Sequence, residues 1–524
     1  MFVIRLGWMI VPLLFLLSCS RPLTCPPEGF GPQPVVSTKQ GYSFSTGVLP
    51  ENRSAFLPLE NPADAYAARL WLVDHAAESL DVQYYIFKDD RIGNDFLYHL
   101  LQAADRGVQV RLLLDDLTTT DKDTNWAMVS CHPRIEVKIF NPNPWRRFLR
   151  NVALILDIET LGKRMHNKAL VADGRAAIVG GRNIGDEYYL PESPVMFIDA
   201  DILAVGAVVP EISEAFEIYW RSEESIKAEK ILDGAFTPES FARTLQNFRQ
   251  INETFEASDT FETIERSAFM DAARRGTLKF TLADRAWFYY DLPQKVSTSK
   301  RDNETHLSSR IREDIEKTRE SLILVSPYFI PSGPMLERLK AARKRGVDIT
   351  VVTNSLASTD VAVVYSGYRK YIEPLLKMGV RLYEVKPMQF EKKGLKRRER
   401  RQRRMSLHTK LIIADNDRLI MGSANIDPRS VKLNTEYLLE IASKPLTTEV
   451  TNSLKKVMDL DHLYRLAWEK YPRWAANGDD DFYGPVWITR EKNETVRYYR
   501  PPGVGFFKRL GIGLFGLLPL EGQL

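Results

Sequence analysis

Hydrophobic and polar positions along residues 61–114 alternate between helical and strand-like patterns. The predicted elements are a helix over 61–78, a strand over 80–87, a helix over 94–107 and a strand over 108–114. Asn61 and Asn94 are typical N-cap residues and Gly107 is a typical helix stop, so the helix ends are marked independently of the apolar pattern. Strands that are apolar throughout and alternate with helices are typical of sheets covered on both faces. The pattern therefore predicts an α/β fold.

The same patterns return later in the chain. Residues 78–87 resemble 320–329, residues 103–110 resemble 342–349, and residues 166–168 resemble 408–410. The first and last of these pairs are both 242 residues apart, and all three keep their order. A repeat of whole helix and strand units indicates a duplicated architecture. We therefore predict two related halves, at 61–220 and 305–470.

The segments outside the two halves have separate predicted roles. Residues 1–19 are predicted to be a signal peptide, 20–60 a tether, 221–304 a connector and 471–524 a membrane-associating C-terminal segment. We expect the connector to pack on the second half. Its tail contains the strand-like sequence Trp287-Phe288-Tyr289-Tyr290.

The composition is that of an ordinary folded protein. The 524 residues are 44% apolar and 27% charged, with a net charge of +4, which excludes a disordered chain, a multi-spanning membrane protein and a polybasic nucleic-acid coat. The three cysteines, Cys19, Cys25 and Cys131, are too few for a disulfide scaffold and form no metal-binding spacing. Whether Cys25 pairs with Cys131 stays open.

The N-terminus has the features of an export signal. Arg5 precedes an apolar stretch of signal-peptide length, too short to span a bilayer comfortably. The stretch ends in Leu16-Leu17-Ser18-Cys19, which resembles the bacterial lipobox and predicts lipidation at Cys19. An uncleaved anchor and a plain secretory signal are the alternatives. Each of them places the mature chain outside the cytoplasm, at a membrane.

One constellation of polar residues occurs once in each half. The first copy is His166, Lys168, Asp173, Gly180 and Asn183; the second is His408, Lys410, Asp415, Gly422 and Asn425. Every interval is identical in the two copies. His and Lys two positions apart on a strand project from the same face, and a turn at the aspartate returns the chain toward the same pocket. Two such copies are a strong motif signal.

These residue types suit a phosphodiester substrate. Neutral histidine is a nucleophile and a general acid–base near neutral pH. Lysine is a compact cation that binds phosphate, and asparagine adds neutral donors. Lysine is not a metal ligand at neutral pH, and no motif such as HExxH is present. We therefore expect metal-independent chemistry with no cofactor.

The paired His-x-Lys-x4-Asp-x6-Gly-x2-Asn pattern resembles the HKD motifs of the phospholipase D superfamily. Residues 60–524 are similar to bacterial cardiolipin synthases, most of all the C type, with support from residues 354–360, 422–430 and 517–521. The resemblance implies two fused α/β/α sandwich halves with the active site at their pseudo-twofold interface. It also implies phosphatidyl transfer to phosphatidylglycerol, with phosphatidylethanolamine as a possible donor.

The resemblance also implies roles for individual residues. His166 would form a phosphohistidine, and His408 would protonate the leaving alcohol and deprotonate the incoming one. The phosphate would be held by Lys168, Lys410, Asn183, Asn425 and Ser423. Asp173 and Asp415 belong to the catalytic motif but lie a strand length from their histidines, which favours a structural role. Acidic residues after the motifs, namely Asp199, Asp201 and Glu436, are candidates to orient the histidines.

Two further features indicate an anionic or apolar partner; the basic run suits lipid headgroups and nucleic acid alike, and the apolar C-terminal segment favours the membrane. Residues 392–404 hold nine Lys or Arg, and residues 506–518 are apolar but too short to span a bilayer. We predict a membrane-anchored lipoprotein of the bacterial envelope, facing the periplasm, that makes cardiolipin. The alternatives are a phospholipase D that releases phosphatidic acid, a secreted endonuclease, and a tethered binding protein. The need for an accessory protein stays open.

Overall fold

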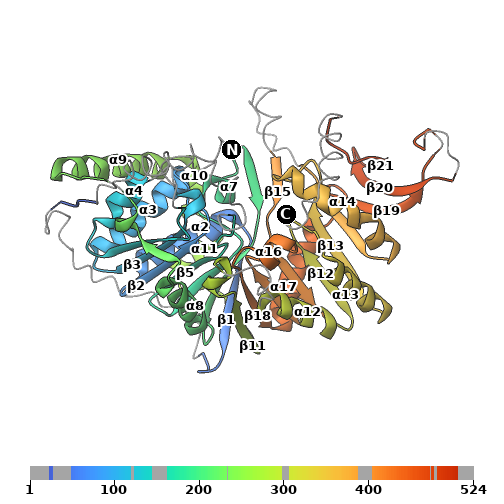
Figure 1. Ribbon diagram of the computed structural model, residues 1–524, viewed down its shortest axis with the longest axis horizontal. Helices are drawn as coiled ribbons and strands as arrows, with labels where there is room; N and C mark the ends of the chain where they lie inside the picture. The colour runs from blue at the N-terminus through green and yellow to red at the C-terminus, as the bar shows by residue number, and fades with distance from the viewer. Residues whose placement is uncertain are drawn as a thin grey trace, which may run out of the picture.

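The computed structural model describes residues 23–26, 49–119, 123–143, 162–232, 234–297, 306–387, 404–472, 474–476 and 481–505. Two α/β halves lie side by side, the first blue to green and the second yellow to red in Figure 1. The predicted fold class is confirmed. Within the described ranges, no helix is both long enough and apolar enough to cross a bilayer.

The first half is built on a nine-stranded sheet in the order β10-β1-β8-β6-β5-β2-β3-β4-β9. Strands β2, β3 and β4 pair in parallel, and the other neighbours are antiparallel. Its elements are β1 (Ser54–Leu59), α2 (Pro62–His75), β2 (Ser79–Tyr84), α3 (Arg91–Asp105), β3 (Gln109–Asp115), α4 (Asp123–Ser130), β4 (Ile135–Phe140), β5 (Lys168–Ala172), β6 (Ala176–Gly180), α7 (Asp186–Tyr189), β7 (Val195–Ile198), β8 (Asp201–Gly206), α8 (Val209–Arg221) and β9 (Ser225–Lys227).

The second half repeats this plan on a ten-stranded sheet in the order β11-β18-β17-β16-β12-β13-β14-β19-β20-β21. Its elements are α12 (His306–Lys317), β12 (Ser321–Val325), α13 (Gly333–Lys344), β13 (Asp348–Asn354), α14 (Ala362–Lys377), β14 (Arg381–Val385), β15 (Arg404–Leu407), β16 (Leu411–Ala414), β17 (Arg418–Gly422), α16 (Pro428–Lys432), β18 (Tyr437–Ala442), α17 (Lys444–Val457), β19 (Leu463–Lys470), β20 (Tyr483–Glu491) and β21 (Glu494–Tyr498).

The central strands are apolar throughout because both of their faces are buried. On β5, Leu170 and Ala172 lie in the core of the first half. The alternate residues Ala169 and Val171 lie in a different cluster, which also contains Ile413 of the second half. A strand turns successive side chains to opposite faces. The second face of each sheet is therefore buried in a core that the two halves share.

The predicted helix ends agree with the structure at two positions and differ at one. The Asn61 side chain accepts from the backbone N–H of Ala63, as expected for an N-cap. Gly107 follows α3 with a φ of +101°. The N-cap of α3, however, is Asp90, which accepts from the N–H of Gly93, and not Asn94. Asn94 lies inside the helix, where its amide donates to the Asp90 carbonyl.

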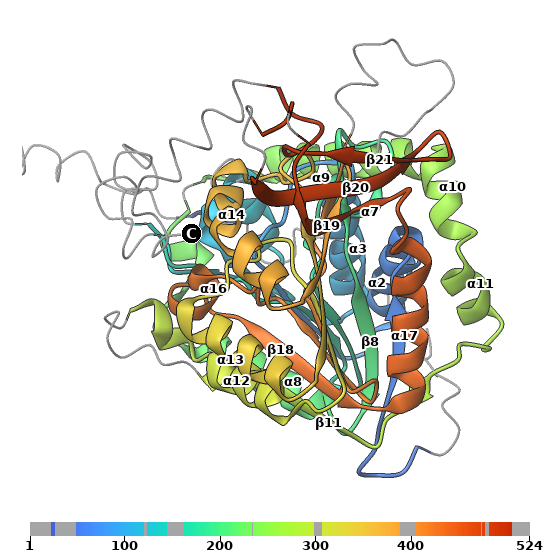
Figure 2. The same cartoon turned by 90° about the vertical axis from the view of Figure 1, so that its right-hand side faces the viewer.

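The connector packs mainly on the first half, which corrects the expectation for residues 221–304. Its elements are β9, α9 (Pro238–Glu256), α10 (Asp259–Glu265), α11 (Ala268–Arg274), β10 (Thr281–Leu282) and β11 (Arg285–Tyr290). Helix α9 contacts α3, while α10 and α11 contact α2, and the aromatic side chains of Phe241, Phe248 and Phe255 enter the first core. Of the connector's strands, β11 pairs with β18 of the second half. Figure 2 shows α10 and α11 along one side of the molecule.

Three parts of the predicted flanking segments belong to the folded body. Part of the predicted tether, β1, is an inner strand of the first sheet, between β8 and β10. Part of the predicted C-terminal segment, β20 and β21, extends the second sheet. Cys25, also in the predicted tether, forms a disulfide with Cys131. Cross-strand pairing and a covalent bond thus join residues on both flanks to the folded body.

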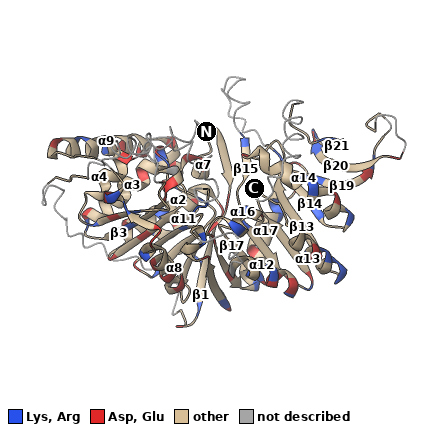
Figure 3. Cartoon of the chain, in the orientation of Figure 1, with Lys and Arg blue, Asp and Glu red and all other residues tan. Residues whose placement is uncertain are grey.

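Several predicted features lie outside the described residues. These are the signal peptide with Cys19, the basic residues 392–403 and the apolar segment 506–518. In the described part of the chain, acidic and basic residues are interspersed over both halves (Figure 3).

Candidate active site

The two motif histidines lie where each half extends a segment against the other. The His166 N–H donates to the carbonyl of Thr435 at 2.9 Å, beside a bridge between Met165 and Thr435. In the same way β15, which leads to His408, pairs in parallel with β7 of the first half. The histidine–lysine pairs therefore stand at the junction of the halves, at the start of β5 and just before β16.

Each histidine is bound by an acid from the opposite half. His166 Nδ1 lies 2.8 Å from Glu436 Oε2 and 3.0 Å from the carbonyl oxygen of Ser423. His408 Nδ1 lies 2.6 Å from Asp199 Oδ2. An Nδ1 nitrogen held by a carboxylate leaves Nε2 for substrate, as in other acid–histidine pairs. This crossed arrangement makes each half incomplete without the other.

The two acids are ionised in their buried positions. Burial favours the neutral form of Glu436, but its interaction with His166, the charge of Lys168 and the hydrogen bond from Ser423 outweigh it and hold its pKa below the usual range. Burial acts in the same direction on Asp199, whose pKa nevertheless falls to about 2 beside His408, Lys410 and Arg182. Two fixed negative charges are thus available to stabilise a positive imidazole.

His166 is neutral at rest. Burial lowers the pKa of His166 to about 4, and the charge of Lys168 acts in the same direction against Glu436. Burial and then the charge of Lys410 lower the pKa of His408. A neutral imidazole with a free Nε2 is the form that attacks an electrophile.

The motif lysines are buried beside their histidines. Lys168 Nζ donates to the His166 carbonyl at 2.5 Å, and Lys410 Nζ donates to the His408 carbonyl at 2.5 Å. Burial lowers the pKa of Lys168 to about 7, with the charge of Lys410 adding to this against Glu436. Two cations held together out of water make a strong site for an anionic phosphoryl group.

The motif aspartates bind backbone N–H groups, in agreement with the structural role that their distance from the histidines favours. Asp173 accepts from the N–H groups of Ala77, Glu78 and Ser79 at the start of β2. Asp415 does the same for Arg319, Glu320 and Ser321 at the start of β12. Both have a left-handed backbone, with φ values of +53° and +52°. Their function in the structure is to join the turn after the motif strand to a neighbouring strand.

The asparagines and Ser423 differ from a simple phosphate cradle. Asn183 accepts from the Ile86 N–H at 3.0 Å and donates to the Tyr188 hydroxyl at 2.7 Å. The buried Oδ1 of Asn425 has no hydrogen-bond partner among the described residues. The Ser423 hydroxyl donates to Glu436 at 2.5 Å. The side chains of Asn183 and Ser423 therefore form hydrogen bonds with other groups of the protein.

Asp201 does not orient a histidine, contrary to expectation. Its carboxylate pairs with Arg69 at 2.9 Å and with Arg182 at 3.2 Å, and all three side chains are buried. Asp199 lies in the link just before β8 and reaches His408 across the junction, whereas Asp201 is the first residue of β8 and pairs inside the first half.

The sequence prediction missed several residues that support the site. Tyr437, on β18 of the second half, donates through its hydroxyl to the carbonyls of Lys168 and Gly180 in the first. Asp291 accepts from the Glu436 N–H at 3.1 Å and from Lys295 Nζ at 2.8 Å. Asp291 directly follows the predicted strand around Trp287–Tyr290, which is the one signal that could have identified it.

Comparisons with known proteins agree with this geometry. Residues 71–220 and 311–458 each match the family described as "Cardiolipin synthase, PLD-like domain". Cardiolipin synthase C of Escherichia coli strain K12 is 34% identical over 486 residues, which is 91% of this chain and 99% of the relative. The major cardiolipin synthase ClsA of Bacillus subtilis strain 168 is 26% identical over 415 residues, 77% of this chain and 70% of the relative.

A solved structure supports the architecture. The phosphatidylserine synthase of Haemophilus influenzae Rd KW20 superposes with a TM-score of 0.53 at 13% identity, over 79% of this chain and 90% of that one. At this identity the likeness concerns the fold alone. Fold and site together define a phospholipase D-type enzyme with two fused halves. The chain belongs to the family of cardiolipin synthases with PLD-like domains.

Proposed function

We propose that this protein is a phosphatidyltransferase that makes cardiolipin from phosphatidylglycerol and a second phospholipid. The observation that carries the proposal is the pair of buried histidines, each bound by an acid of the opposite half, in a chain 34% identical to a cardiolipin synthase over nearly its whole length. The second phospholipid donates the phosphatidyl group, and resemblance to the C type favours phosphatidylethanolamine as this donor.

In the first step, Nε2 of His166 attacks the phosphorus of the donor lipid. An N–P bond forms, the P–O bond to the headgroup alcohol breaks, and His408, which begins this step protonated on both ring nitrogens with Nδ1 bound by Asp199, gives its Nε2 proton to the departing alkoxide. Glu436 stabilises the positive charge that develops on His166. The order in which the histidines act follows the family resemblance, since the pair is nearly symmetric.

In the second step, a hydroxyl of phosphatidylglycerol loses its proton to His408 and attacks the same phosphorus. An O–P bond forms and the N–P bond breaks, which restores both histidines. The charges of Lys168 and Lys410 stabilise the phosphoryl oxygens throughout. They take the place that a divalent ion has in other phosphoryl-transfer sites, so the chemistry needs no metal.

We also propose that the mature protein is a lipoprotein attached through Cys19 and facing the periplasm. The disulfide between Cys25 and Cys131 supports an oxidising compartment. It lies six residues after the proposed lipidation site, so the folded body would sit close to the membrane surface. Acyl chains, the basic residues 392–403 and the apolar segment 506–518 would then keep the site at its lipid substrates.

The test is lipid mass spectrometry in a bacterium that lacks its own cardiolipin synthases. Wild type, His408→Ala and a control, His462→Ala, would be expressed at matched levels. His462 is a suitable control because its side chain is 39% exposed and pairs with Asp459 away from the junction. We expect cardiolipin with wild type and control and none with His408→Ala. Phosphatidic acid without cardiolipin would make the protein a hydrolase, and no lipid change would contradict the proposal.

A further inference from the structure

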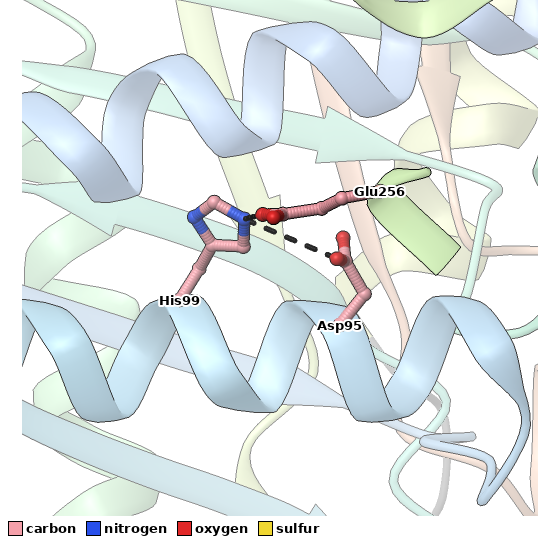
Figure 4. A group of neighbouring side chains, drawn as sticks. All are labelled: Asp95, His99 and Glu256. Carbon is pink, nitrogen blue, oxygen red and sulfur yellow. Dashed lines mark ion pairs between the residues drawn. The ribbon is translucent and has the colours of Figure 1, made fainter. Parts of the chain in front are cut away.

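A second cluster of ionisable side chains lies away from the histidine pair, between the first half and the connector. Asp95 and His99 stand four residues apart on one face of α3, and Glu256 ends α9, which packs against that helix. One ligating atom of each lies within 4.8 Å of the others. In the described part of the chain this is the one group of three such side chains. Figure 4 shows the three side chains converging on a common point.

Two of these side chains are buried and point unpartnered atoms into the cluster. His99 is 7% exposed, and its Nε2 has no hydrogen-bond partner among the described residues. Asp95 is fully buried, and its Oδ1 is also without such a partner there. Buried polar atoms left unpaired are costly, so such a pair indicates a ligand that completes them.

The remaining atoms of these side chains are held in place. His99 Nδ1 lies 2.7 Å from Asp74 Oδ1, which turns Nε2 toward the cluster. The Tyr66 hydroxyl donates to Asp95 Oδ2 at 2.5 Å, which leaves Oδ1 facing His99. A histidine whose second nitrogen is bound by a carboxylate is the usual supporting arrangement of a metal-ligating imidazole.

We propose that Asp95, His99 and Glu256 form a divalent metal site of the zinc type that fastens α9 to α3. The His99 Nε2 lies 4.0 Å from Asp95 Oδ1 and 3.9 Å from Glu256 Oε1. Zinc bonds of about 2.0–2.2 Å place tetrahedral ligands about 3.4 Å apart, so the two distances from His99 must each shorten by about half an ångström. Glu256 supplies that freedom, because its side chain is 41% exposed.

The kinds of ligand atom in this cluster favour some metals over others. An imidazole nitrogen with two carboxylates suits zinc, whereas calcium and magnesium prefer oxygen ligands alone. A water molecule would take the fourth position. Asp74, Asp95 and Glu256 all face the His99 imidazole, so their carboxylates would offset the charge of a bound cation.

This metal site is distinct from the proposed active site. Its role would be to hold the connector against the first half. Helix α9 places Phe241, Phe248 and Phe255 in the first core, while its other face carries polar residues. A metal that bridges the end of α9 to α3 stabilises the folded protein without touching the substrate. Loss of zinc and loss of lipid transfer are thus independent results.

The test is zinc binding by the purified full-length protein after chelation and dialysis. We expect about one equivalent of zinc by plasma mass spectrometry on adding Zn²⁺ alone, with a rise in Tm of a few degrees. His99→Gln should lose both. Glu256→Gln, at the exposed rim, should fold normally and bind zinc at least 10-fold more weakly.

The matched control is His132→Gln. His132 is as buried as His99 and lies 3.2 Å from a single carboxylate, that of Asp105. Its substitution should leave the zinc equivalent and the zinc-dependent Tm shift unchanged. Wild type that binds less than about a tenth of an equivalent, or His99→Gln that binds as wild type does, would overturn the proposal. The first result would leave the cluster as a network of ion pairs.

Discussion

The two half-sites orient their histidines on the same plan with different parts. Glu436 receives hydrogen bonds from the hydroxyls of Ser423 and Ser430, besides its contact with His166. Asp199, which holds His408, is fixed on its other oxygen by the N–H of Ala200 at 2.9 Å. The longer acid is thus positioned by side chains and the shorter one by backbone.

The two half-sites also differ at the motif position that lies beside each acid. Ser423 in the second copy corresponds to Gly181 in the first. A Cβ at Gly181 would overlap the carboxylate of Asp199. The first half therefore needs glycine where the second uses a serine hydroxyl. The two copies of the motif have the same reactive residues, but different residues position the acid that binds each histidine.

The largest effect should come from neutralising the acids. We expect Asp199→Asn to lower kcat/KM by about 10³-fold and Glu436→Gln by about 10²-fold, within the range for general acid–base partners. Asp199 is the more sensitive because Lys410 Nζ lies 3.0 Å from His408 Nδ1 and opposes a positive imidazole once the carboxylate is neutral. Single-turnover phosphatidyl transfer by the purified protein measures both.

Asp461→Asn, an exposed acid paired with Arg490, is the control and should match wild type. Equal losses in Asp199→Asn and Glu436→Gln would mean that the different supports have no consequence for catalysis.

Exchanging Gly181 and Ser423 for one another's residue type should lower transfer activity by unequal amounts. Gly181→Ser places a side chain against Asp199, and we expect a loss of about 10–100-fold in transfer. Ser423→Gly removes one hydrogen bond to Glu436, worth about 0.5–1.5 kcal/mol, or about 2–13-fold. Activity is compared at equal folded fraction, measured by circular dichroism. A larger loss in Ser423→Gly than in Gly181→Ser would contradict the packing argument.

The pH profile of kcat/KM should be bell-shaped. Activity is lost as pH falls through about 4, where His166 becomes protonated, and as pH rises through about 7, where Lys168 loses its charge. Lys168→Arg keeps the charge, so its alkaline limb should move up by at least about one pH unit, with a lower maximum. Lys410→Arg is the comparison. An unchanged alkaline limb in Lys168→Arg would remove Lys168 as the titrating group.

The smallest effects should come from the motif aspartates, where the halves are alike. Asp173→Asn and Asp415→Asn weaken contacts to three backbone N–H groups each, and each should lower stability by about 1 kcal/mol. The pKa of Asp415 is held below its usual range by these N–H groups, against burial. Its contribution is therefore present above the unfolded pKa and lost as pH falls through the lower folded value.

Chemical denaturation measures these differences, and transfer activity should stay near wild type. A loss of more than about 10-fold in either variant at full folding would restore a catalytic role for the aspartate.

The sequence was most informative where local rules act. The matching intervals around His166 and His408 identified both motifs, and the apolar runs identified β2 and β3 within a few residues. Prediction failed where a residue's partner is far away in sequence. Asp201 could not be distinguished from Asp199, and the connector was placed on the wrong half, because Phe241, Phe248 and Phe255 show that α9 is amphipathic but not which core it enters.

The sequence by itself determined the duplicated α/β architecture and the residue types of the phosphoryl-transfer site, because periodicity and spacing act within one segment. Only the tertiary structure decided that Glu436 serves His166 and Asp199 serves His408, each across the junction. It also brought Glu256 of α9 to Asp95 and His99 of α3. Such contacts depend on which buried faces pack together, and that is settled by the shape and volume of the whole core.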